Sequence, residues 1–411
     1  MASFSIFLPL FFSLLSLVSS SPNSLLLPIT KDTTTLQYLT TLSYGTPFLP
    51  TKLVVDLTGS LFWLHCSSRK TPSFSLRTIP HRSLQCLTAK TNQTFEFPID
   101  QNHPCQILTE NTITGKVATD GKLVEDVVAF KSTKDSIFEH AHDFLFTCSH
   151  TLLLNGLSSD AKGIVGFGRS RTSFSSQVFN SINSQRKITF CLSSSSGFVQ
   201  LGSTSTVFES STKSEIFRSL TFTPLVESQN HESFINVKSI KIGGKKVSFN
   251  TPSLSQEGNS GTKLSSIVPY TTIQSSIYGN FKSAFLKAAF SMNMTRVTSV
   301  APFDVCFDSN GIDESKVGPN VPVIDFVLQS EMVKWSIYGR NSMVKLSDDV
   351  MCLGLLDGGV EQKNPIVIGG YQFEDVLVQF DFDSSMVGFS SSLLMRDSSC
   401  SNFRFGSISS Q

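Results

Sequence analysis

The feature that most constrains this fold is a pair of similar segments far apart in the chain. The first, residues 53–60 (LVVDLTGS), is an apolar run that enters a tight turn and presents one carboxylate, Asp56. The second, residues 262–266 (TKLSS), has the same outline but carries Ser265 where a carboxylate is expected. If the two segments are equivalent, the chain holds two copies of one architecture, and one copy lacks its carboxylate.

A second correspondence supports this pairing. An apolar–apolar–glycine segment follows each turn at a similar distance: Gly166 lies 110 positions after Asp56, and Gly369 lies 104 positions after Ser265. A chain of 411 residues also exceeds the size of one ordinary core. The near-repeat therefore predicts two duplicated β-rich lobes that face each other.

Alternation of apolar and polar residues, the pattern of half-buried strands, dominates the rest of the chain. It is clear at residues 36–64 and in a hairpin at 111–130 that turns near residues 114–115. One helix stands out, and Ser275 or Ser276 can cap it. Its apolar residues recur at helical spacing and are Ile277, Phe281, Phe285, Ala288 and Ala289. The pattern predicts a mainly β protein.

Residues 163–168 (GIVGFG) form a glycine-rich segment that could cradle a phosphate. No lysine followed by serine or threonine comes after it, and no helical pattern follows directly. We predict instead that these glycines allow two backbones to pack closely.

Charge and histidine content exclude several functions. The 33 basic residues balance the 32 acidic ones, which argues against a nucleic-acid binder or a protein that binds anionic membranes. His140 and His142 could bind a metal, but no third ligand is evident. We therefore expect neither a metal nor a cofactor.

The first twenty residues predict export. Residues 1–20 are almost wholly apolar and end in LVSS, which indicates a signal peptide cleaved near Ser20. Its apolar core, residues 4–18, is shorter than the roughly 20 residues that a membrane span needs. We expect a soluble, secreted protein, glycosylated at the sequons of Asn92 and Asn293 where these are exposed.

The cysteines agree with export. An even number of cysteines in an exported chain implies disulfides, and the absence of a C-x-x-C motif argues against zinc or a redox dithiol. Their spacing alone leaves the connectivity open. The eight are Cys66, Cys86, Cys105, Cys148, Cys191, Cys306, Cys352 and Cys400.

These features resemble the pepsin-like aspartic protease fold, in which an apolar–apolar–glycine strand locks an Asp-Thr/Ser-Gly turn in each lobe. Residues 56–60 look like the first such turn with one extra residue inside the triplet. A narrower resemblance is to the plant family of TAXI-type xylanase inhibitors, extracellular dermal glycoprotein and gamma-conglutin. It rests on residues 38–40, 262–271, 293–297, 300–303, 328–331, 352–354, 368–372 and 400–403.

The resemblance implies an organisation for the whole chain. After the signal peptide we expect an N-terminal lobe at 33–202, a connection at 203–230, a C-terminal lobe at 231–393 and a tail at 394–411. The connection is placed where residues 203–219 are rich in serine, threonine and lysine and show little periodicity. Family members usually carry twelve cysteines, so this chain departs from them, chiefly between residues 66 and 105. The implied disulfides are Cys191–Cys400 between the lobes, Cys306–Cys352 in the C-terminal lobe, and Cys66–Cys148 and Cys86–Cys105 in the N-terminal lobe.

The chemistry expected of the fold is incomplete here. An aspartic peptidase uses two carboxylates that share one proton, one acting as base on a water and the other as acid. Ser265 cannot ionise near neutral pH, so Asp56 has no acid partner and is expected to have a more nearly normal pKa. Active relatives also close a flap with a tyrosine over the substrate, but no tyrosine lies at residues 111–117. We predict an inactive peptidase in which Asp56 is structural.

If the chain binds instead of cutting, its exposed loops carry the function. The resemblance implies that C-terminal loops enter the cleft of a secreted glycoside hydrolase, a xylanase or endoglucanase, whose two catalytic carboxylates are natural partners for cations. Arg396 matches one arginine that inhibitory family members insert into such a cleft. Lys316 lies where these members carry a second arginine, and a lysine keeps the charge but lacks the planar guanidinium fork. Both could also be ordinary solvated cations.

The sequence therefore predicts a secreted inhibitor of cell-wall-degrading glycoside hydrolases in the extracellular space or cell wall of a plant, with a role in defence. Two alternatives remain: an atypical aspartic endopeptidase that uses Asp56, and a storage or carbohydrate-binding glycoprotein. The oligomeric state stays open.

Overall fold

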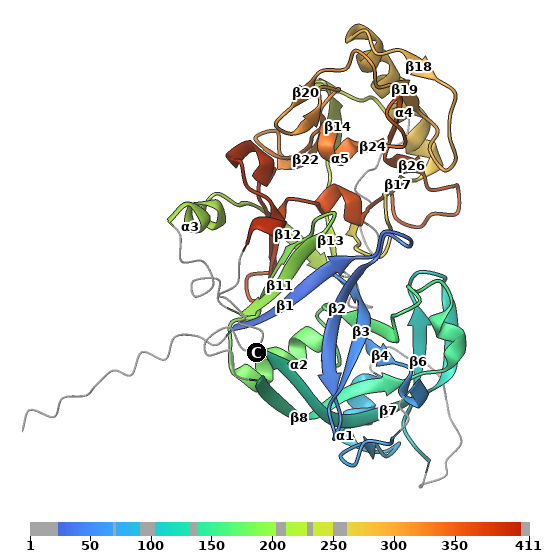
Figure 1. Cartoon of the computed structure of the whole chain (residues 1–411), viewed down its shortest axis with the longest axis vertical. Coiled ribbons are helices and arrows are strands. Elements are labelled where there is room, and N and C mark those ends of the chain that lie inside the picture. Colours follow the sequence, from blue (N-terminus) through green and yellow to red (C-terminus); the bar gives the residue numbers. More distant parts are fainter. Residues whose placement is uncertain are drawn as a thin grey trace, which may run out of the picture.

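A computed structural model describes residues 24–68, 71–90, 103–131, 138–202, 211–227, 233–249 and 261–403. Within them the chain forms two lobes built largely of strands, blue to green and yellow to red in Figure 1. The mainly β, two-lobed prediction is confirmed. The predicted signal peptide and Asn92 lie outside the described residues, as do parts of the predicted connection and tail.

The N-terminal half contributes eleven described strands and four helical segments. The strands are β1 (Ser24–Lys31), β2 (Tyr38–Tyr44), β3 (Leu49–Asp56), β4 (Phe62–Leu64), β5 (Arg77–Thr78), β6 (Gln106–Asn111), β7 (Lys116–Lys131), β8 (Phe138–Cys148), β9 (Gly163–Gly166), β10 (Lys187–Cys191) and β11 (Ser196–Gly202). The helices are α1 (Leu84–Ala89) and α2 (Phe174–Ile182), with 3-10 turns η1 (Cys66–Ser68) and η2 (Thr151–Leu154).

The C-terminal half contains shorter strands. They are β12 (Thr221–Glu227), β13 (Ser233–Ile235), β14 (Ser239–Ile242), β15 (Lys245–Lys246), β16 (Thr262–Leu264), β17 (Thr271–Ile273), β18 (Arg296–Val297), β19 (Cys306–Asp308), β20 (Glu314–Ser315), β21 (Gly318–Pro319), β22 (Ile324–Ser330), β23 (Val333–Ile337), β24 (Met343–Lys345), β25 (Val350–Leu353), β26 (Leu355–Asp357), β27 (Ile366–Ile368), β28 (Leu377–Asp381) and β29 (Met386–Phe389). The helical segments are α3 (Ser211–Arg218), α4 (Ser275–Ser291), α5 (Gly339–Ser342), η3 (Gly370–Phe373), η4 (Leu393–Arg396) and η5 (Cys400–Asn402).

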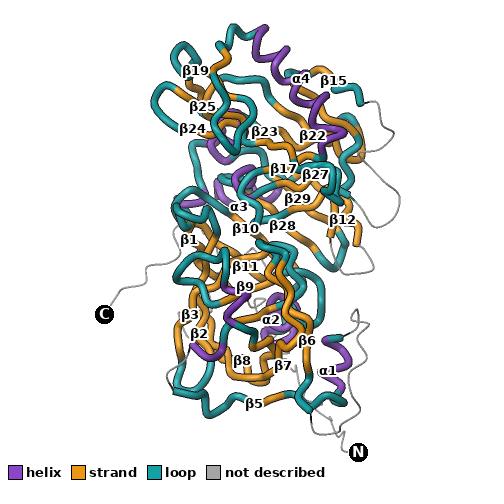
Figure 2. Tube along the Cα trace, turned by 90° about the vertical axis from the view of Figure 1, so that its right-hand side faces the viewer, coloured by secondary structure: helices purple, strands orange, loops and turns teal. Residues whose placement is uncertain are grey.

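A central antiparallel sheet joins the two lobes. Strands β1, β11 and β10 from the N-terminal half pair with β28, β29 and β12 from the C-terminal half, in that order. These strands cross the middle of the molecule in Figure 2. Edge-to-face contacts of Phe190 with Phe167 and with Phe380, 5.5 and 5.8 Å between ring centroids, continue the apolar core across this sheet. The lobes therefore share one hydrophobic core at their junction.

The two predicted turns occupy equivalent places. Strand β3 runs parallel to β9, with Asp56 opposite Gly166, and β16 runs parallel to β27, with the Ser265 N–H donating to the carbonyl of Ile368 at 2.9 Å. A Cβ on Gly166 would collide with the carbonyls of residues 59 and 61, and one on Gly369 would collide with the backbone of Tyr270. The glycines are thus needed for close packing, as predicted.

The sequence analysis predicted one helix, which forms, but it misplaced the cap of that helix and missed the other helices. Helix α4 forms as predicted and buries Ile277, Phe281 and Phe285 against the core. Its N-cap, however, is Gln274, whose side chain accepts a hydrogen bond from the N–H of Ser276 at 2.9 Å, so capping by a serine was wrong. Helix α2 was not predicted, although Ser173 caps it. Among the described residues, no helix is long and apolar enough to cross a membrane.

Candidate functional site

Asp56 lies buried at the end of β3, and both of its carboxylate oxygens have a donor. The Thr58 N–H donates to Oδ1 at 3.3 Å, and the Thr112 hydroxyl donates to Oδ2 at 3.2 Å. Only 5% of Asp56 is exposed. The carboxylate is therefore held by the protein itself.

Thr112 comes from the tip of the β6–β7 hairpin, the segment that corresponds to the predicted flap. The Asn111 side chain shapes this tip: its Oδ1 accepts from the N–H groups of Ile113 and Thr114 at 2.8 and 3.2 Å, and its Nδ2 donates to the Leu153 carbonyl at 2.7 Å. The flap thus closes directly onto Asp56. A water attacking a peptide would have to compete with the Thr112 hydroxyl for this carboxylate. The sequence analysis missed this contact, for which the only local signal is a threonine in the predicted flap.

Burial raises the pKa of Asp56 above its ordinary value, and the charge of Lys263 and the bond from Thr58 offset this shift only in part. The expectation of a more nearly normal pKa is therefore wrong. Losing the second carboxylate removes one cause of a raised pKa, but burial of Asp56 in the closed turn supplies another.

This raised pKa predicts the behaviour of Asp56→Asn. The unfolded carboxyl loses its proton at lower pH than the folded one, so the wild-type fold loses stability as pH rises through the folded pKa. Asparagine avoids this loss and can still accept from Thr58. We therefore expect the stability of Asp56→Asn relative to wild type to increase from about pH 3 to about pH 7, measured by chemical unfolding.

The exposed Asp160 provides the control. Its pKa is lowered by a hydrogen bond from Lys52 at 2.7 Å, so its contribution is present above the unfolded pKa and is lost as pH falls. Asp160→Asn should show the opposite trend with pH. A difference between Asp56→Asn and wild type that does not vary with pH would contradict the assignment.

Ser265 occupies the position equivalent to Asp56. It is 5% exposed, and its Oγ accepts hydrogen bonds from the N–H groups of Ile267 and Val268, both at 3.2 Å. The hydroxyl thus closes its own turn locally. A serine here cannot hold the proton that a second carboxylate would share with Asp56.

The contacts between the two turns are nevertheless intact. The Ser266 hydroxyl donates to the Val55 carbonyl at 2.6 Å and accepts from the Leu57 N–H at 3.1 Å. In the other direction, the Thr58 hydroxyl donates to the Leu264 carbonyl at 3.3 Å. The hydroxyl that makes this contact from the first turn, on Thr58, lies two residues after Asp56. In the second turn the corresponding hydroxyl, on Ser266, lies one residue after Ser265. The backbone framework of a two-carboxylate site persists, while the second carboxylate is missing.

The two predicted target-binding cations lie on neighbouring exposed loops. Lys316 is in the turn between β20 and β21, and its Nζ contacts both carboxylate oxygens of Asp397 at 2.8 and 2.9 Å. Arg396 ends η4 beside Asp397, and its guanidinium donates to the Ser219 hydroxyl at 3.2 Å. The structure therefore joins two loops that are 80 residues apart in the sequence.

The Lys316 turn rests on helix α5. The Arg340 N–H donates to the Val317 carbonyl at 2.7 Å. The next residue, Asn341, donates through Nδ2 to the carbonyls of Tyr371 and Glu374 at 3.1 and 2.8 Å. This chain of contacts fixes the turn to η3 and the residue that follows it.

The same segment fixes the Arg396 loop. The Asp375 carbonyl accepts from the Leu393 N–H at 2.8 Å, and its carboxylate accepts from the Cys400 N–H at 2.9 Å. These contacts flank Arg396 on both sides. Residues 370–375 therefore position both cationic loops.

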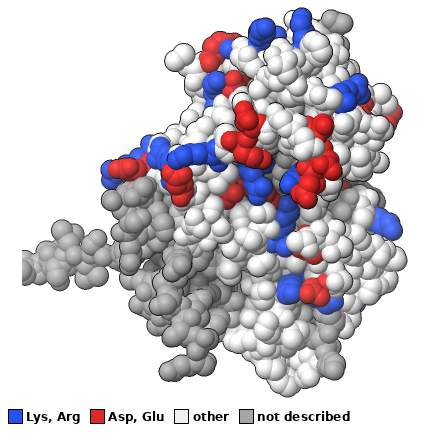
Figure 3. Space-filling view, turned by 45° about the horizontal axis from the view of Figure 1, so that its top comes forward, with Lys and Arg blue, Asp and Glu red and all other residues white. Residues whose placement is uncertain are grey.

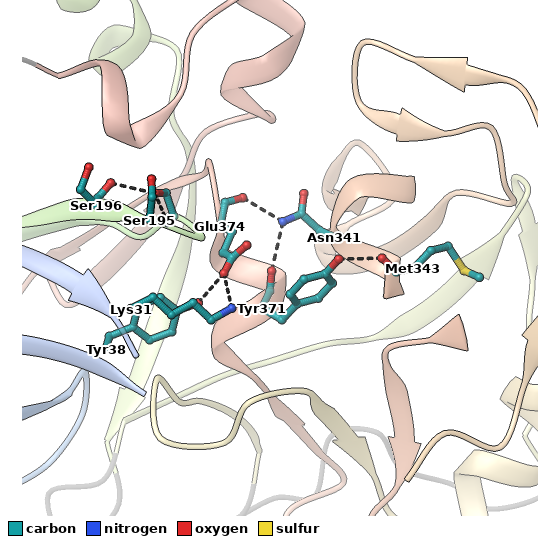
Figure 4. A network of polar contacts seen from close by, with 9 residues as sticks. Lys31, Tyr38, Ser195, Ser196, Asn341, Met343, Tyr371 and Glu374 are labelled. Atoms are coloured by element: carbon teal, nitrogen blue, oxygen red, sulfur yellow. Dashed lines mark hydrogen bonds and ion pairs between the residues drawn. The ribbon is translucent and has the colours of Figure 1, made fainter. Parts of the chain in front are cut away.

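A buried ion pair anchors this segment to the N-terminal lobe. Lys31 ends β1, and its Nζ lies 2.6 Å from Oε1 of Glu374, to which the Tyr38 hydroxyl also donates at 2.9 Å. The side chains of Lys31 and Glu374 are only 10% and 2% exposed. Figure 4 shows both donors converging on the Glu374 carboxylate, beside the ring of Tyr371.

Arg340 was missed by the sequence analysis. It is exposed, it lies beside the Lys316 turn, and its guanidinium makes no hydrogen bond or ion pair with any described residue. Nothing in the local sequence distinguishes it from other surface cations, because its relation to the turn arises only in the fold.

The remaining predicted residues are placed as follows. Four disulfides join Cys66–Cys148, Cys86–Cys105, Cys191–Cys400 and Cys306–Cys352, the same pairs that the resemblance implied. Asn293 is exposed just after α4. His140 stacks on Phe48 at 5.0 Å, and no three possible metal ligands gather among the residues with described positions.

On the face shown in Figure 3, acidic and basic groups lie side by side.

The fold, with a turn that carries Ser265 in place of an aspartate, defines a pepsin-like protein. Comparison with known proteins specifies its family. Residues 38–203 match the family model "Xylanase inhibitor N-terminal", and residues 232–391 match "Xylanase inhibitor C-terminal". The chain therefore belongs to the TAXI-type xylanase inhibitor family of pepsin-like proteins.

Individual relatives agree with this assignment. The chain is 42% identical to probable aspartic proteinase GIP2 of Nicotiana benthamiana, covering 95% of this chain and 94% of that protein. It is 36% identical to gamma conglutin 1 of Prunus dulcis, covering 94% and 91%. The solved structure of EDGP aligns with a TM-score of 0.84 at 39% identity, over 94% of this chain and 99% of that one. An aspartic proteinase from Irpex lacteus, at 12% identity and a TM-score of 0.57, shows the shared fold alone.

Proposed function

We propose that this protein is secreted, lacks peptidase activity, and inhibits a cell-wall-degrading glycoside hydrolase by inserting Arg396 and Lys316 into its cleft. The observation that carries the proposal is the contrast between the two sites. Asp56 has no second carboxylate and is closed off by the flap, whereas Arg396 and Lys316 are exposed on loops that residues 370–375 hold through hydrogen bonds.

The chemistry of the target matches these loops. Glycoside hydrolases place two carboxylates in an open cleft, and a guanidinium binds a carboxylate through two parallel hydrogen bonds. Lys316 must leave Asp397 to reach such a target, but both side chains are exposed, 66% and 74%, so breaking this pair costs at most about 1 kcal/mol. Arg340, beside the same turn, adds a fork-shaped cation that makes no hydrogen bond or ion pair with a described residue through its guanidinium.

The names of the matching family models support part of this proposal. The family models are named for xylanase inhibitors, and their two matches together span most of the chain. Gamma conglutins and basic 7S globulin, by contrast, are not named for any hydrolase. The inhibitory target must therefore be found by experiment.

The test is a titration of the purified, secreted protein against a microbial xylanase and a xyloglucan endoglucanase, with a peptide-cleavage assay on the same preparation. We expect stoichiometric inhibition of one hydrolase and no pepstatin-sensitive cleavage from acid to neutral pH. Arg396→Ala should weaken inhibition by roughly 30-fold or more, because it leaves a target carboxylate without its partner. Lys316→Arg should strengthen inhibition by restoring the planar fork.

The control is Arg77→Ala, which removes a cation that is 74% exposed on the other lobe and should leave inhibition unchanged. Pepstatin-sensitive cleavage that Asp56→Asn abolishes would instead identify an atypical endopeptidase. Absence of both activities would favour a storage or carbohydrate-binding protein.

A further inference from the structure

The C-terminal end of α4 carries an aromatic side chain that the fold does not use. Phe281 and Phe285 on the same helix are fully buried, but Phe290 in its last turn is 81% exposed. Phe290 also begins the segment FSMNMT, residues 290–295, in which Asn293 and Thr295 form a glycosylation sequon. An exposed aromatic ring thus lies three residues before an acceptor asparagine.

The backbone around Asn293 is defined by a helix-terminating motif. The N–H of Met294 donates to the Ala289 carbonyl at 3.1 Å, and the N–H of Asn293 donates to the Phe290 carbonyl at 3.0 Å. Asn293 itself adopts a left-handed φ of 59°. These two bonds and this φ form a Schellman motif, in which asparagine is the common alternative to glycine at the left-handed position.

This motif separates buried from exposed side chains. Met294 is 7% exposed and packs into the main core, which anchors the end of the helix. Asn293 and Thr295 on either side of it are exposed, as a glycosylation acceptor and its hydroxyl partner must be. The Asn293 N–H donates to the Phe290 carbonyl, so the Schellman motif brings the backbones of these two exposed residues together.

We propose that Asn293 carries an N-linked glycan whose first N-acetylglucosamine packs its apolar face on the ring of Phe290. The Asn293 amide nitrogen attacks the anomeric carbon of a lipid-pyrophosphate-linked oligosaccharide. The amide loses one proton, the N-glycosidic bond forms, and the lipid pyrophosphate leaves. The attached sugar then covers apolar surface that the ring otherwise exposes to water.

The position of the sequon is compatible with the function proposed above. Strand β18, which begins directly after Thr295, lies at the end of the C-terminal lobe farthest from the N-terminal lobe in Figure 1. The sequon therefore lies at an end of the lobe that is remote from the central sheet. The proposal requires export of the chain, but it does not require any hydrolase target.

The experiment uses the full chain secreted from a yeast host that adds high-mannose glycans. Wild type, Phe290→Ala, Thr295→Val and the double variant are compared, because Thr295→Val removes the sequon without changing the left-handed asparagine. Peptide mass spectrometry measures occupancy of Asn293, and thermal unfolding is recorded on the fully occupied fraction. We expect Phe290→Ala to lower Tm by about 2 °C in the glycosylated protein and to leave Tm unchanged in the Thr295→Val background.

Two further measurements isolate the first sugar. Trimming the glycan with an endoglycosidase to a single N-acetylglucosamine should preserve the effect of Phe290→Ala. Phe74→Ala, which removes a ring that is 84% exposed but has no neighbouring sequon, should show no dependence on the glycan. An unmodified Asn293 in the secreted protein, equal effects of Phe290→Ala in both backgrounds, or loss of its effect on trimming would each overturn the proposal.

Discussion

Replacing Lys31 by methionine will lower the free energy of unfolding by about 3–5 kcal/mol, because it leaves a buried carboxylate without its partner. Glu374 is 2% exposed on its side chain and lies 2.6 Å from the Lys31 ammonium. In the variant, the Tyr38 hydroxyl would be the one donor left to its carboxylate among the described residues. Chemical unfolding measures the loss directly.

The double variant Lys31→Met, Glu374→Gln distinguishes an unpaired charge from lost packing. Removing both charges removes the buried ion, so we expect the double variant to recover most of the stability lost by Lys31→Met. If Lys31→Met and the double variant are equally unstable, packing and not charge is the cause.

An exposed pair serves as the matched control. Lys52 and Asp160 are separated by a similar 2.7 Å, but their side chains are 50% and 63% exposed. Lys52→Met should therefore lower the free energy of unfolding far less than Lys31→Met does, because solvent screens an exposed pair. Equal costs for Lys31→Met and Lys52→Met would contradict the importance of burial.

This ion pair also bears on the proposed inhibition. Glu374 belongs to residues 370–375, whose carbonyls and carboxylate hold the Lys316 turn and the Arg396 loop. If the pair positions these loops, the folded double variant should bind its hydrolase more weakly even where its stability is restored.

Removing the disulfide between the lobes will have an effect of similar size. Cys191 and Cys400 are 209 positions apart, and a cross-link over such a loop contributes about 5 kcal/mol by restricting the unfolded chain. Both sulfurs are also buried among apolar side chains, including Phe198 and Leu377. We expect the double Cys→Ala variant to show this loss in chemical unfolding.

The Cys86–Cys105 disulfide is the natural comparison. It closes a loop with a separation of only 19, so the same argument predicts a contribution of about 3 kcal/mol. Its removal should also leave inhibition intact, because it lies in the N-terminal lobe. By contrast, loss of Cys191–Cys400 should weaken inhibition, since Cys400 anchors the loop that carries Arg396. A larger cost at Cys86–Cys105 would contradict the argument from loop length.

Much of the framework was predictable because its signals are local. The correspondence between Asp56 and Ser265, and the glycines that follow each turn, are visible as short motifs at similar spacing. Strand alternation predicted the flap hairpin, and helical spacing predicted the buried face of α4. The sequence analysis was wrong where several residue types can perform the same role, as at the N-cap of α4, which is Gln274 and not a serine.

The functional surfaces were harder to predict for a physical reason. The hydroxyl that donates to the Asp56 carboxylate belongs to Thr112, 56 residues away in the sequence. The carboxylate that binds the Lys316 ammonium belongs to Asp397, 81 residues away. A contact between residues that are far apart in the sequence leaves no local pattern, because many other threonines and aspartates lie at comparable separations from Asp56 and Lys316. Only the folded backbone selects which of them meet.

The sequence alone determined that this chain has two β-rich lobes and only one of the two carboxylates that a pepsin-like site needs. These properties depend on residue identity and short-range periodicity, which no tertiary contact can alter. The tertiary structure alone decided that the flap closes on Asp56, that burial raises the pKa of this carboxyl, and that one segment anchored by Lys31 supports both cationic loops. These properties depend on burial and on distances between segments, which exist only after the chain has folded.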